Sequence, residues 1–591
     1  MKYRLTIIFC ALLSSQCAPV KEKIPPVETM NNKTTGKPVV YQIMTRLFGN
    51  KVKTNKPFGT IQENGVGKLN DITPAALKAI HDLGVTHVWY TGVIEHALLT
   101  DYSAFNIARD AVDVVKGHAG SPYAIKDYYD VNPDLAVSVP NRMAEFEALI
   151  NRTHAEGLQV IIDFVPNHVA RAYRSDARPP GVADLGEHDD KNAAFSPKNN
   201  FYYLPGQALK LPFPAKEGGY VENPAKATGN NVFSATPGVN DWFETVKLNY
   251  GVDYQNNHAM AFDPIPDTWV KMKDILVFWA GKNVDGFRCD MAEMVPVEFW
   301  RWAIPQVKAV NPNIVFIAEI YNPGQYRNYI QQGQFDFLYD KVQLYDTLRL
   351  LVQNGHASTA DVTNIRHELT DISDHMLHFL ENHDEQRIAS KFFAGDPWKA
   401  IPAMVVSALI DKGPVMIYFG QEVGEPGAGA EGFSTEDGRT TIFDYWGVPE
   451  HQKWVNDGKY DGGQLSPEQK QLRQFYSDLL NMAAHNPAIT DGAYMDLTAF
   501  NQTAKNFDGQ VHAFLRYKDN EKLIIITSFN EKPQPVRIQL SPEAIAALGL
   551  SAPEIITARD LIWRAVEVGF DKDYGFALEL KPYSALVLKI K

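Results

Sequence analysis

The feature that most constrains the fold of this 591-residue chain is an alternation of short apolar runs with amphipathic stretches. Helical patterns separate most of the runs, such as the stretch from Pro74 to Leu83, which Thr73 caps and Gly84 ends. Apolar runs that alternate with helices indicate a parallel sheet covered on both faces. Eight such units predict an α/β fold, a closed (β/α)₈ TIM barrel with its active site at the C-terminal strand ends. The runs lie at 39–47, 85–90, 158–165, 284–290, 314–319, 336–338, 376–380 and 414–419.

Two regions interrupt this alternation. Residues 169–253 have no clean period and are rich in Pro, Gly, Asn and aromatic residues. We therefore expect an irregular insertion after the third strand, folded as a small subdomain rather than as a long unstructured loop. Beyond Asn486, short apolar runs separated by turn residues predict an all-β module with strands at 511–517, 522–529, 536–540 and 585–590. The sequence thus predicts a barrel domain over 38–490, which contains the insertion, and a C-terminal β-sandwich domain over 491–591.

The N-terminal segment has the pattern of a targeting signal. A basic start precedes the apolar run from Leu5 to Leu13, which is too short to span a bilayer. The small residues before Cys17 resemble a lipoprotein cleavage site, although Gln16 departs from the usual small residue. A plain secretory signal cut nearby is the alternative. We expect export to the periplasm or cell surface, with a leader over 1–17, a lipid anchor at Cys17 and a flexible tether over 18–37.

Charge and cysteine content narrow the class of protein. The formal net charge of −13 argues against a nucleic-acid partner, which requires a basic face. Of three cysteines, Cys10 and Cys17 belong to the expected leader and only Cys289 remains. No disulfide framework is therefore available, and the fold must be held together by burial.

Five chemically active side chains lie at or just beyond the ends of predicted strands. Arg288 and Asp290 end the fourth strand, and Glu319 ends the fifth. His383 and Asp384 follow the seventh. Cleavage of an acetal needs one carboxylate as nucleophile and one carboxylic acid as proton donor, held in different protonation states by their surroundings. The alternative for each acid is a helix cap or an ion pair that only stabilises the fold.

Four ordered motifs resemble the signatures of the α-amylase family of retaining glycoside hydrolases, glycoside hydrolase family 13. They are DFVPNH at 163–168, GFRCD at 286–290, FIAE at 316–319 and FLENHD at 379–384. SPYAIKDYY at 121–129 resembles a supporting motif after the second strand, and PYSA at 582–585 resembles part of the family's C-terminal β-domain. The resemblance runs from about Val39 to the C-terminus and implies cleavage of α-glucosidic bonds.

The resemblance implies a role for each acidic residue. Asp290 is the expected nucleophile, and Arg288 keeps it ionised. Glu319 is the expected acid in the first step and base in the second. Asp384 is expected to hold sugar hydroxyls and to favour an oxocarbenium-like transition state. Asp163 is expected to support Arg288 or the top of the barrel.

Three further residues are expected to bind the sugar. His168 and His383 are expected to donate or accept hydrogen bonds, and Tyr123 to stack on the apolar face of the ring. Packing in the core is the alternative for Tyr123 and for His168.

One metal ligand and one departure complete the comparison with the family. Asn167 resembles a calcium ligand, since hard cations bind oxygen donors. Other ligands would come from the insertion, with Asp253 as a candidate. Where many starch-cleaving relatives carry Lys-His after the nucleophile, this chain has Glu293 and Met294. The change has two interpretations. Either this side of the site is only rearranged, or the subsite that binds the acceptor has an altered preference.

The sequence leaves three functions open. The first is an exported hydrolase of α-glucans such as starch, maltodextrins or related oligosaccharides. The second is a transglycosylase or isomerase that uses the same covalent intermediate. The third is a catalytically inactive glucan-binding protein at the cell surface, which the presence of both nucleophile and acid argues against.

Overall fold

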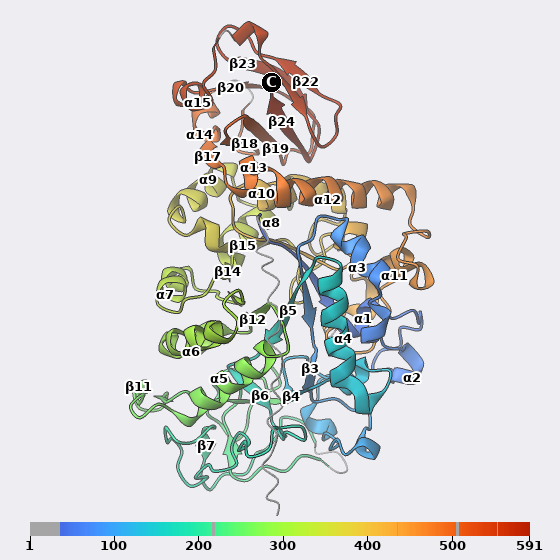
Figure 1. Cartoon of the computed structure of the whole chain (residues 1–591), viewed down its shortest axis with the longest axis vertical. Helices are drawn as coiled ribbons and strands as arrows, with labels where there is room; N and C mark the ends of the chain where they lie inside the picture. Colours follow the sequence, from blue (N-terminus) through green and yellow to red (C-terminus); the bar gives the residue numbers. More distant parts are fainter. Residues whose placement is uncertain (1–35, 215–218, 434, 504–506, 552) are drawn as a thin grey trace, which may run out of the picture. The chain divides into compact units, whose positions relative to one another are not determined.

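The computed structural model of the protein describes residues 36–591 except 215–218, 434, 504–506 and 552 (Figure 1). The predicted leader, Cys17 and the tether up to residue 35 lie outside the described residues. Among the residues that are described, no helix is both long enough and apolar enough to cross a membrane.

The described residues include a closed barrel of eight parallel strands, which confirms the predicted fold class. Each strand pairs with its neighbour in the chain, and the last pairs with the first. Each apolar run of the sequence overlaps one strand, and five of the strands are buried along their whole length. The strands are β1 (Val39–Met44), β2 (His87–Thr91), β5 (Gln159–Phe164), β12 (Gly286–Cys289), β13 (Val315–Ala318), β14 (Phe337–Tyr339), β15 (Met376–Phe379) and β16 (Val415–Tyr418).

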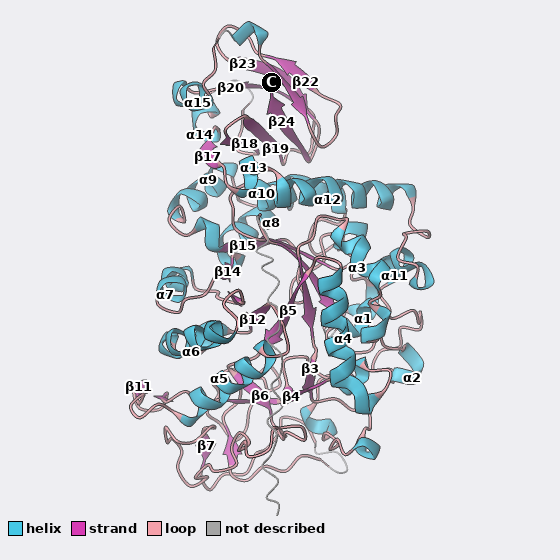
Figure 2. Cartoon of the chain, viewed as in Figure 1, coloured by secondary structure: helices cyan, strands magenta, loops and turns pink. Residues whose placement is uncertain are grey.

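Helices follow most of the barrel strands, and Figure 2 shows them around the strands. Helix α3 (Pro74–His81) begins where the sequence predicts, because the Thr73 side chain accepts a hydrogen bond from the backbone N–H of Ala76. The last is the longest and begins with a capping box formed by Ser466 and Gln469. The helices are α3 (Pro74–His81), α4 (Arg142–Ala155), α5 (Asp267–Ala280), α6 (Val297–Val310), α7 (Tyr326–Gln331), α8 (Asp346–Val352), α9 (Thr359–Glu368), α10 (Ile401–Leu409) and α12 (Pro467–His485).

Two excursions from the barrel bring further residues to the C-terminal strand ends. After β2, the strands β3 (Ile94–His96) and β4 (Ile125–Val131) pair antiparallel. After β5, β6 (His168–Ala170) pairs antiparallel with β9 (Thr245–Lys247), which ties the start of the insertion to its later part. The insertion also holds the short pair β7 (Tyr203–Leu204) with β8 (Ala225–Lys226). Its last strand, β10 (Val252–Asp253), pairs with β11 (Ala259–Met260) just beyond it.

The C-terminal region is all-β apart from short helices, as the sequence predicts. Its six-stranded sheet has the order β17-β18-β19-β24-β21-β22, and β20 pairs with β23 in a separate ladder. Apolar side chains of both groups of strands form one buried cluster that includes Ile524, Ile526, Val536 and Ile538. The strands are β17 (Ala493–Asp496), β18 (Val511–Lys518), β19 (Glu521–Ser528), β20 (Gln534–Gln539), β21 (Thr557–Asp560), β22 (Glu567–Gly569), β23 (Gly575–Leu580) and β24 (Ser584–Ile590).

A buried histidine between two aspartates makes the stability of the barrel depend on pH. His378 Nδ1 lies 3.1 Å from an oxygen of Asp340, and Nε2 lies 2.9 Å from an oxygen of Asp411. Burial alone would lower the pKa of His378, but the two carboxylates outweigh it and raise that pKa to about 9. A raised pKa in the folded state means that the proton stabilises the fold below pH 6.5, and that this contribution is lost as the pH rises through about 9.

We therefore expect His378→Asn to lower the free energy of unfolding by about 3–5 kcal/mol below pH 6.5, because it leaves two buried carboxylates without their cation. The difference from the wild type should shrink above pH 9, where the wild type has lost the same proton. Denaturant unfolding at both pH values measures this. His81→Asn, at an exposed position of α3, is the control. Equal losses of unfolding free energy at the two pH values would show that the stabilising positive charge is not on His378.

Candidate active site

The three predicted catalytic carboxylates line one cavity at the C-terminal ends of the barrel strands. Asp290 directly follows β12, and its backbone N–H donates to the carbonyl of Phe164 at 2.9 Å. Glu319 directly follows β13, and its N–H donates to the carbonyl of Cys289 at 3.1 Å. Asp384 follows β15, and all three side chains line a cavity of about 370 Å³. The barrel therefore brings together residues that lie far apart in the sequence.

A single buried guanidinium joins the acidic groups of the site. Nη1 of Arg288 lies 2.8 Å from Asp290 and 3.4 Å from Asp163, and Nη2 lies 2.8 Å from Glu319. Nε donates to the hydroxyl of Tyr339 at 3.2 Å. Because one planar cation contacts both Asp290 and Glu319, the two carboxylates face the same small volume. The predicted role of Asp163 as a support for Arg288 agrees with this geometry, and the Trp89 indole N–H donates to its other oxygen at 2.9 Å.

The surroundings shift the pKa values of Asp290 and Asp384 in opposite directions. Burial raises the pKa of Asp290, the charge of Glu319 raises it further, and Arg288 opposes both. The pair of carboxylates therefore retains a proton to higher pH than an isolated aspartate would. Burial would also raise the pKa of Asp384, but His383 beside it and Arg288 outweigh burial, so the net shift is downward. The surroundings thus shift the pKa of Asp290 upward and that of Asp384 downward.

Glu319 is oriented by two donors that sequence reasoning missed. The backbone N–H of Met291 donates to Oε2 at 2.7 Å, and the Tyr321 hydroxyl donates to Oε1 at 2.7 Å. Tyr321 also lines the cavity. Its position two residues after Glu319 was the available signal, because alternate residues of an extended segment point to the same side. Glu319 therefore has a fixed orientation toward the cavity.

The predicted sugar-binding residues His383 and Tyr123 lie together. His383 Nε2 is 2.5 Å from the Tyr123 hydroxyl and 3.0 Å from Asp384, and Nδ1 is 2.8 Å from the side-chain amide of Gln42 in β1. The rings of Tyr123 and His383 are stacked with centroids 5.1 Å apart. Tyr123 lines the cavity, whereas His383 is almost fully buried. Tyr123 is therefore accessible from the cavity, and His383 contacts both Tyr123 and Asp384 from the buried side.

The insertion contributes Trp242, Glu244 and Thr245 to the lining of the cavity. The Trp242 ring lies 5.1 Å from that of His168, which also lines the cavity. The Lys116 ammonium, from the segment between β3 and β4, lies 2.7 Å from Glu244. The sequence predicts an insertion after the third strand but offers no reason to choose Trp242 or Lys116, because neither belongs to a motif.

The prediction of Asn167 as a metal ligand is not supported by its contacts. The amide oxygen accepts a hydrogen bond from the Lys247 ammonium, and the amide NH₂ donates to the Gly229 carbonyl at 2.9 Å. A cation cannot share that oxygen with an ammonium without strong repulsion. Asp253, the other candidate ligand, accepts a hydrogen bond from the backbone N–H of Gln255 at 3.2 Å.

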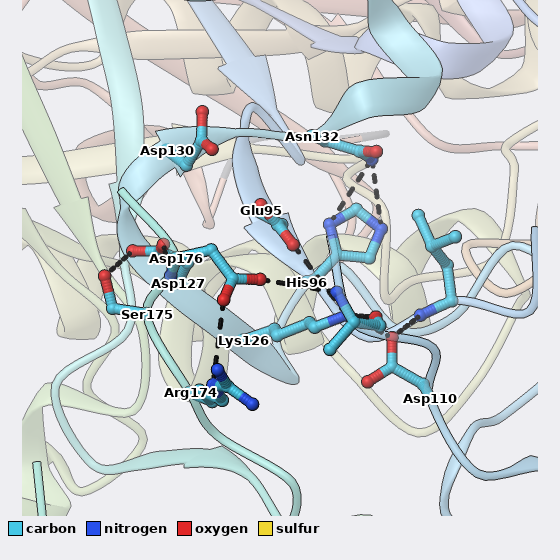
Figure 3. Close-up of polar contacts among 12 residues, drawn as sticks. Glu95, His96, Asp110, Lys126, Asp127, Asp130, Asn132, Arg174, Ser175 and Asp176 are labelled. Carbon is cyan, nitrogen blue, oxygen red and sulfur yellow. Dashed lines mark hydrogen bonds and ion pairs between the residues drawn. The ribbon is translucent and has the colours of Figure 1, made fainter. Parts of the chain in front are cut away.

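Another group of carboxylates lies on the hairpin of β3 and β4, where one oxygen each of Glu95, Asp127 and Asp130 lie within 4.8 Å of one another (Figure 3). Arg142 pairs with Asp130, and the Lys126 ammonium is 3.9 Å from Glu95. Four donors fill the lone-pair positions of Asp127: Tyr129 N–H, Ser175 Oγ–H, Asp176 N–H and Ala177 N–H. Asp127 therefore has no free lone pair for a cation, and the cluster ties the hairpin to the insertion.

Three comparisons with known proteins agree with this geometry. The sequence pattern of the alpha amylase catalytic domain matches residues 42–445. Alpha-amylase 3 of Dictyoglomus thermophilum is 23% identical over 429 residues, which cover 69% of this chain and 74% of that protein. Cyclomaltodextrin glucanotransferase of Geobacillus stearothermophilus is 23% identical over 406 residues, which cover 65% of this chain and 49% of that protein.

The fold has solved counterparts of the same kind. The structure of the alpha-amylase of Geobacillus thermoleovorans aligns with a TM-score of 0.61 and 19% identity, and the alignment covers 95% of this chain and 99% of that one. At this identity the likeness shows the fold alone. The sequence pattern, however, spans more than half of the chain and includes Arg288, Asp290, Glu319 and Asp384. With its barrel, its carboxylates at the strand ends and this match, the protein is a glycosidase of the α-amylase family, glycoside hydrolase family 13.

Proposed function

We propose that the protein is an exported, retaining α-glucan hydrolase that cleaves α-glucosidic bonds in starch, maltodextrins or related oligosaccharides by double displacement. The observation that carries the proposal is the pair of ion contacts from Arg288 to Asp290 and to Glu319. Retaining cleavage requires a nucleophile and an acid about 5–5.5 Å apart. The amylase of similar fold from Geobacillus thermoleovorans was solved with acarbose, which is consistent with an oligosaccharide ligand.

In the first step, an oxygen of Asp290 attacks the anomeric carbon while Glu319 gives its proton to the glycosidic oxygen. The bond between that carbon and the leaving oxygen breaks, and a glycosyl ester of Asp290 forms. Arg288 favours the ionised form of Asp290 before attack. Asp384, whose side chain is 35% exposed, accepts hydrogen bonds from sugar hydroxyls.

In the second step, Glu319 acts as base and takes a proton from water. The water oxygen attacks the anomeric carbon from the face that the leaving group vacated, and the ester bond to Asp290 breaks. Two inversions restore the original configuration, and Glu319 regains its proton. Fixed donors from Met291 and Tyr321 keep Glu319 within reach of the leaving oxygen and of the water.

Transfer to a sugar acceptor instead of water is the second candidate. A cyclomaltodextrin glucanotransferase matches this chain at the same 23% identity as the alpha-amylase. Glu293 and Met294 also replace the Lys-His of many starch-cleaving relatives on the acceptor side. Both candidates share the glycosyl ester and differ in the molecule that opens it. Product analysis with maltooligosaccharides distinguishes them, since transfer yields products longer than the substrate.

We expect Glu319→Gln to lower kcat/KM on maltooligosaccharides by about 10²–10⁴-fold, because the leaving oxygen then receives no proton. The loss should be much smaller on α-glucosyl fluoride, because fluoride leaves without protonation. Glu298→Gln, in the first turn of α6, is the control and should leave both rates unchanged. Equal losses on the two substrates in a folded Glu319→Gln protein would show that another group is the acid.

The proposal of export rests on the leader and on Cys17. Fractionation of cells should place the protein in the periplasm or at the surface. A lipid label should appear on the wild type and disappear in Cys17→Ser. A lipid label on Cys17→Ser would contradict the anchor at Cys17. A wild type confined to the cytoplasm would contradict export.

A further inference from the structure

Lys247 ends β9, and its side chain is almost fully buried at the base of the insertion. In the β6–β9 ladder it pairs with His168, which lines the active-site cavity. Burying an ammonium is costly unless oxygen acceptors or an aromatic ring compensate it. The contacts of Lys247 therefore need an explanation.

The Lys247 ammonium contacts three groups from different parts of the chain. It donates to the side-chain oxygen of Asn167 and to the backbone carbonyl of Met294 at 3.1 Å. The Tyr254 ring lies 5.4 Å away, measured to its centroid. None of these groups carries a formal charge, and no ion pair of Lys247 is found within the described part of the chain. Burial lowers the pKa of Lys247 to about 7. Hydrogen bonds to two oxygens and a nearby aromatic ring are contacts that favour the protonated form.

We propose that the Lys247 ammonium replaces a bound metal ion between the insertion and the loop after the nucleophile. Lys247 holds both segments in place, and no metal cation is bound at Asn167. The sequence resemblance placed a calcium ligand at Asn167, and the structure places an ammonium on the same oxygen. Two positive charges on one oxygen repel each other, and a divalent ion is repelled twice as strongly as a monovalent one. A calcium ion would therefore have to displace Lys247.

Lys247 is a positioning residue because each of its acceptors leads to the catalytic site. Met294 N–H donates to the carbonyl of Met291 at 2.9 Å, and Met291 N–H donates to Glu319 at 2.7 Å. On the other side, the Asn167 side-chain nitrogen lies 3.0 Å from Nδ1 of His168. Lys247 thus fixes the short turn that orients Glu319 and the amide beside His168.

The first test uses the wild-type protein. After dialysis against a chelator of divalent cations, its melting temperature and its kcat/KM should equal those of the same sample with millimolar calcium added. A loss on dialysis that calcium restores would overturn the proposal. The melting temperature decides the chelation experiment even if the proposed substrate is wrong. A failure of this inference can therefore be distinguished from a failure of the proposed function.

The second test removes the charge while keeping the length of the side chain. Lys247→Met should lower kcat by about 10–100-fold, as is typical when a residue that orients catalytic groups is lost, with a much smaller change in KM. Lys247→Arg, which keeps the charge, should retain more kcat than Lys247→Met. Lys226→Met, at a half-buried lysine of the same insertion that pairs with Glu222, should lower the melting temperature without changing kcat.

A wild-type kcat in Lys247→Met would overturn the inference, as would equal losses in the two Lys247 variants. Should Lys247→Met fail to fold, the chelation experiment on the wild type still decides it. The inference rests on the proposed function only for the choice of substrate, because kcat is measured on whichever α-glucan the wild type turns over.

Discussion

Asp290→Asn is expected to lower kcat on α-glucans by about 10⁴-fold or more, because it removes the nucleophile and leaves only substrate binding and the acid. The asparagine side chain has nearly the same shape, and Arg288 keeps its contact with Glu319. The loss should therefore be chemical rather than structural. Release of reducing sugar from maltooligosaccharides by wild type and variant measures it.

Asp274→Asn is the matched control, since its side chain is half exposed in α5. It should keep the wild-type kcat, and both variants should keep the wild-type melting temperature. Equal activity of Asp290→Asn and wild type would exclude Asp290 as nucleophile. No activity in either protein, on several α-glucans, would favour a surface protein that only binds glucans.

Arg288→Met is expected to lower the free energy of unfolding by about 3–5 kcal/mol at neutral pH and to remove most activity. Arg288 is the fully buried cation that contacts Asp163, Asp290 and Glu319. Removing one partner of a buried ionic group leaves the other charges uncompensated. The loss of stability should be smaller in acid, where the three carboxylates take up protons. Denaturant unfolding at neutral and acidic pH tests both statements.

Arg301→Met, at an exposed position of α6, is the control for the loss of one positive charge. Arg288→Lys separates charge from shape, because a lysine cannot hold two carboxylates with a planar fork. It should recover part of the stability and little of the activity. Unchanged stability in Arg288→Met at neutral pH would show that the three carboxylates do not depend on this cation.

The barrel could be predicted because its strands are buried on both faces and read as continuous apolar runs. The β4 strand could not, since Lys126, Asp127 and Asp130 are buried in it and resemble loop residues in the sequence. In the C-terminal region, β18, β19, β20 and β24 were predicted. The strands β17, β21 and β22 were missed because they are short, and β23 because Glu579 interrupts its short apolar run.

Prediction of the active site was limited in the same way: residues within motifs could be identified, whereas the residues that contact them could not. Asp290, Glu319 and Asp384 could be predicted because each follows an apolar strand and belongs to a motif. The residues that orient or enclose them could not, because their partners are distant in sequence. Lys247 contacts Asn167 across 80 residues of irregular chain, and no spacing in the sequence marks that contact. The sequence does not distinguish a metal ligand from a lysine partner at Asn167, because an amide oxygen accepts a hydrogen bond from an ammonium as readily as it binds a cation.

The central claim, that Asp290 attacks the anomeric carbon while Glu319 assists, is tested most directly by trapping the glycosyl ester. A 5-fluoro-α-glucosyl fluoride forms the ester quickly and releases it slowly, so mass spectrometry of the intact protein and of its peptides locates the sugar. We expect one added glycosyl unit, on the peptide that carries Asp290, and none in Asp290→Asn. A glycosyl unit on another residue, or none on an active wild type, would contradict it.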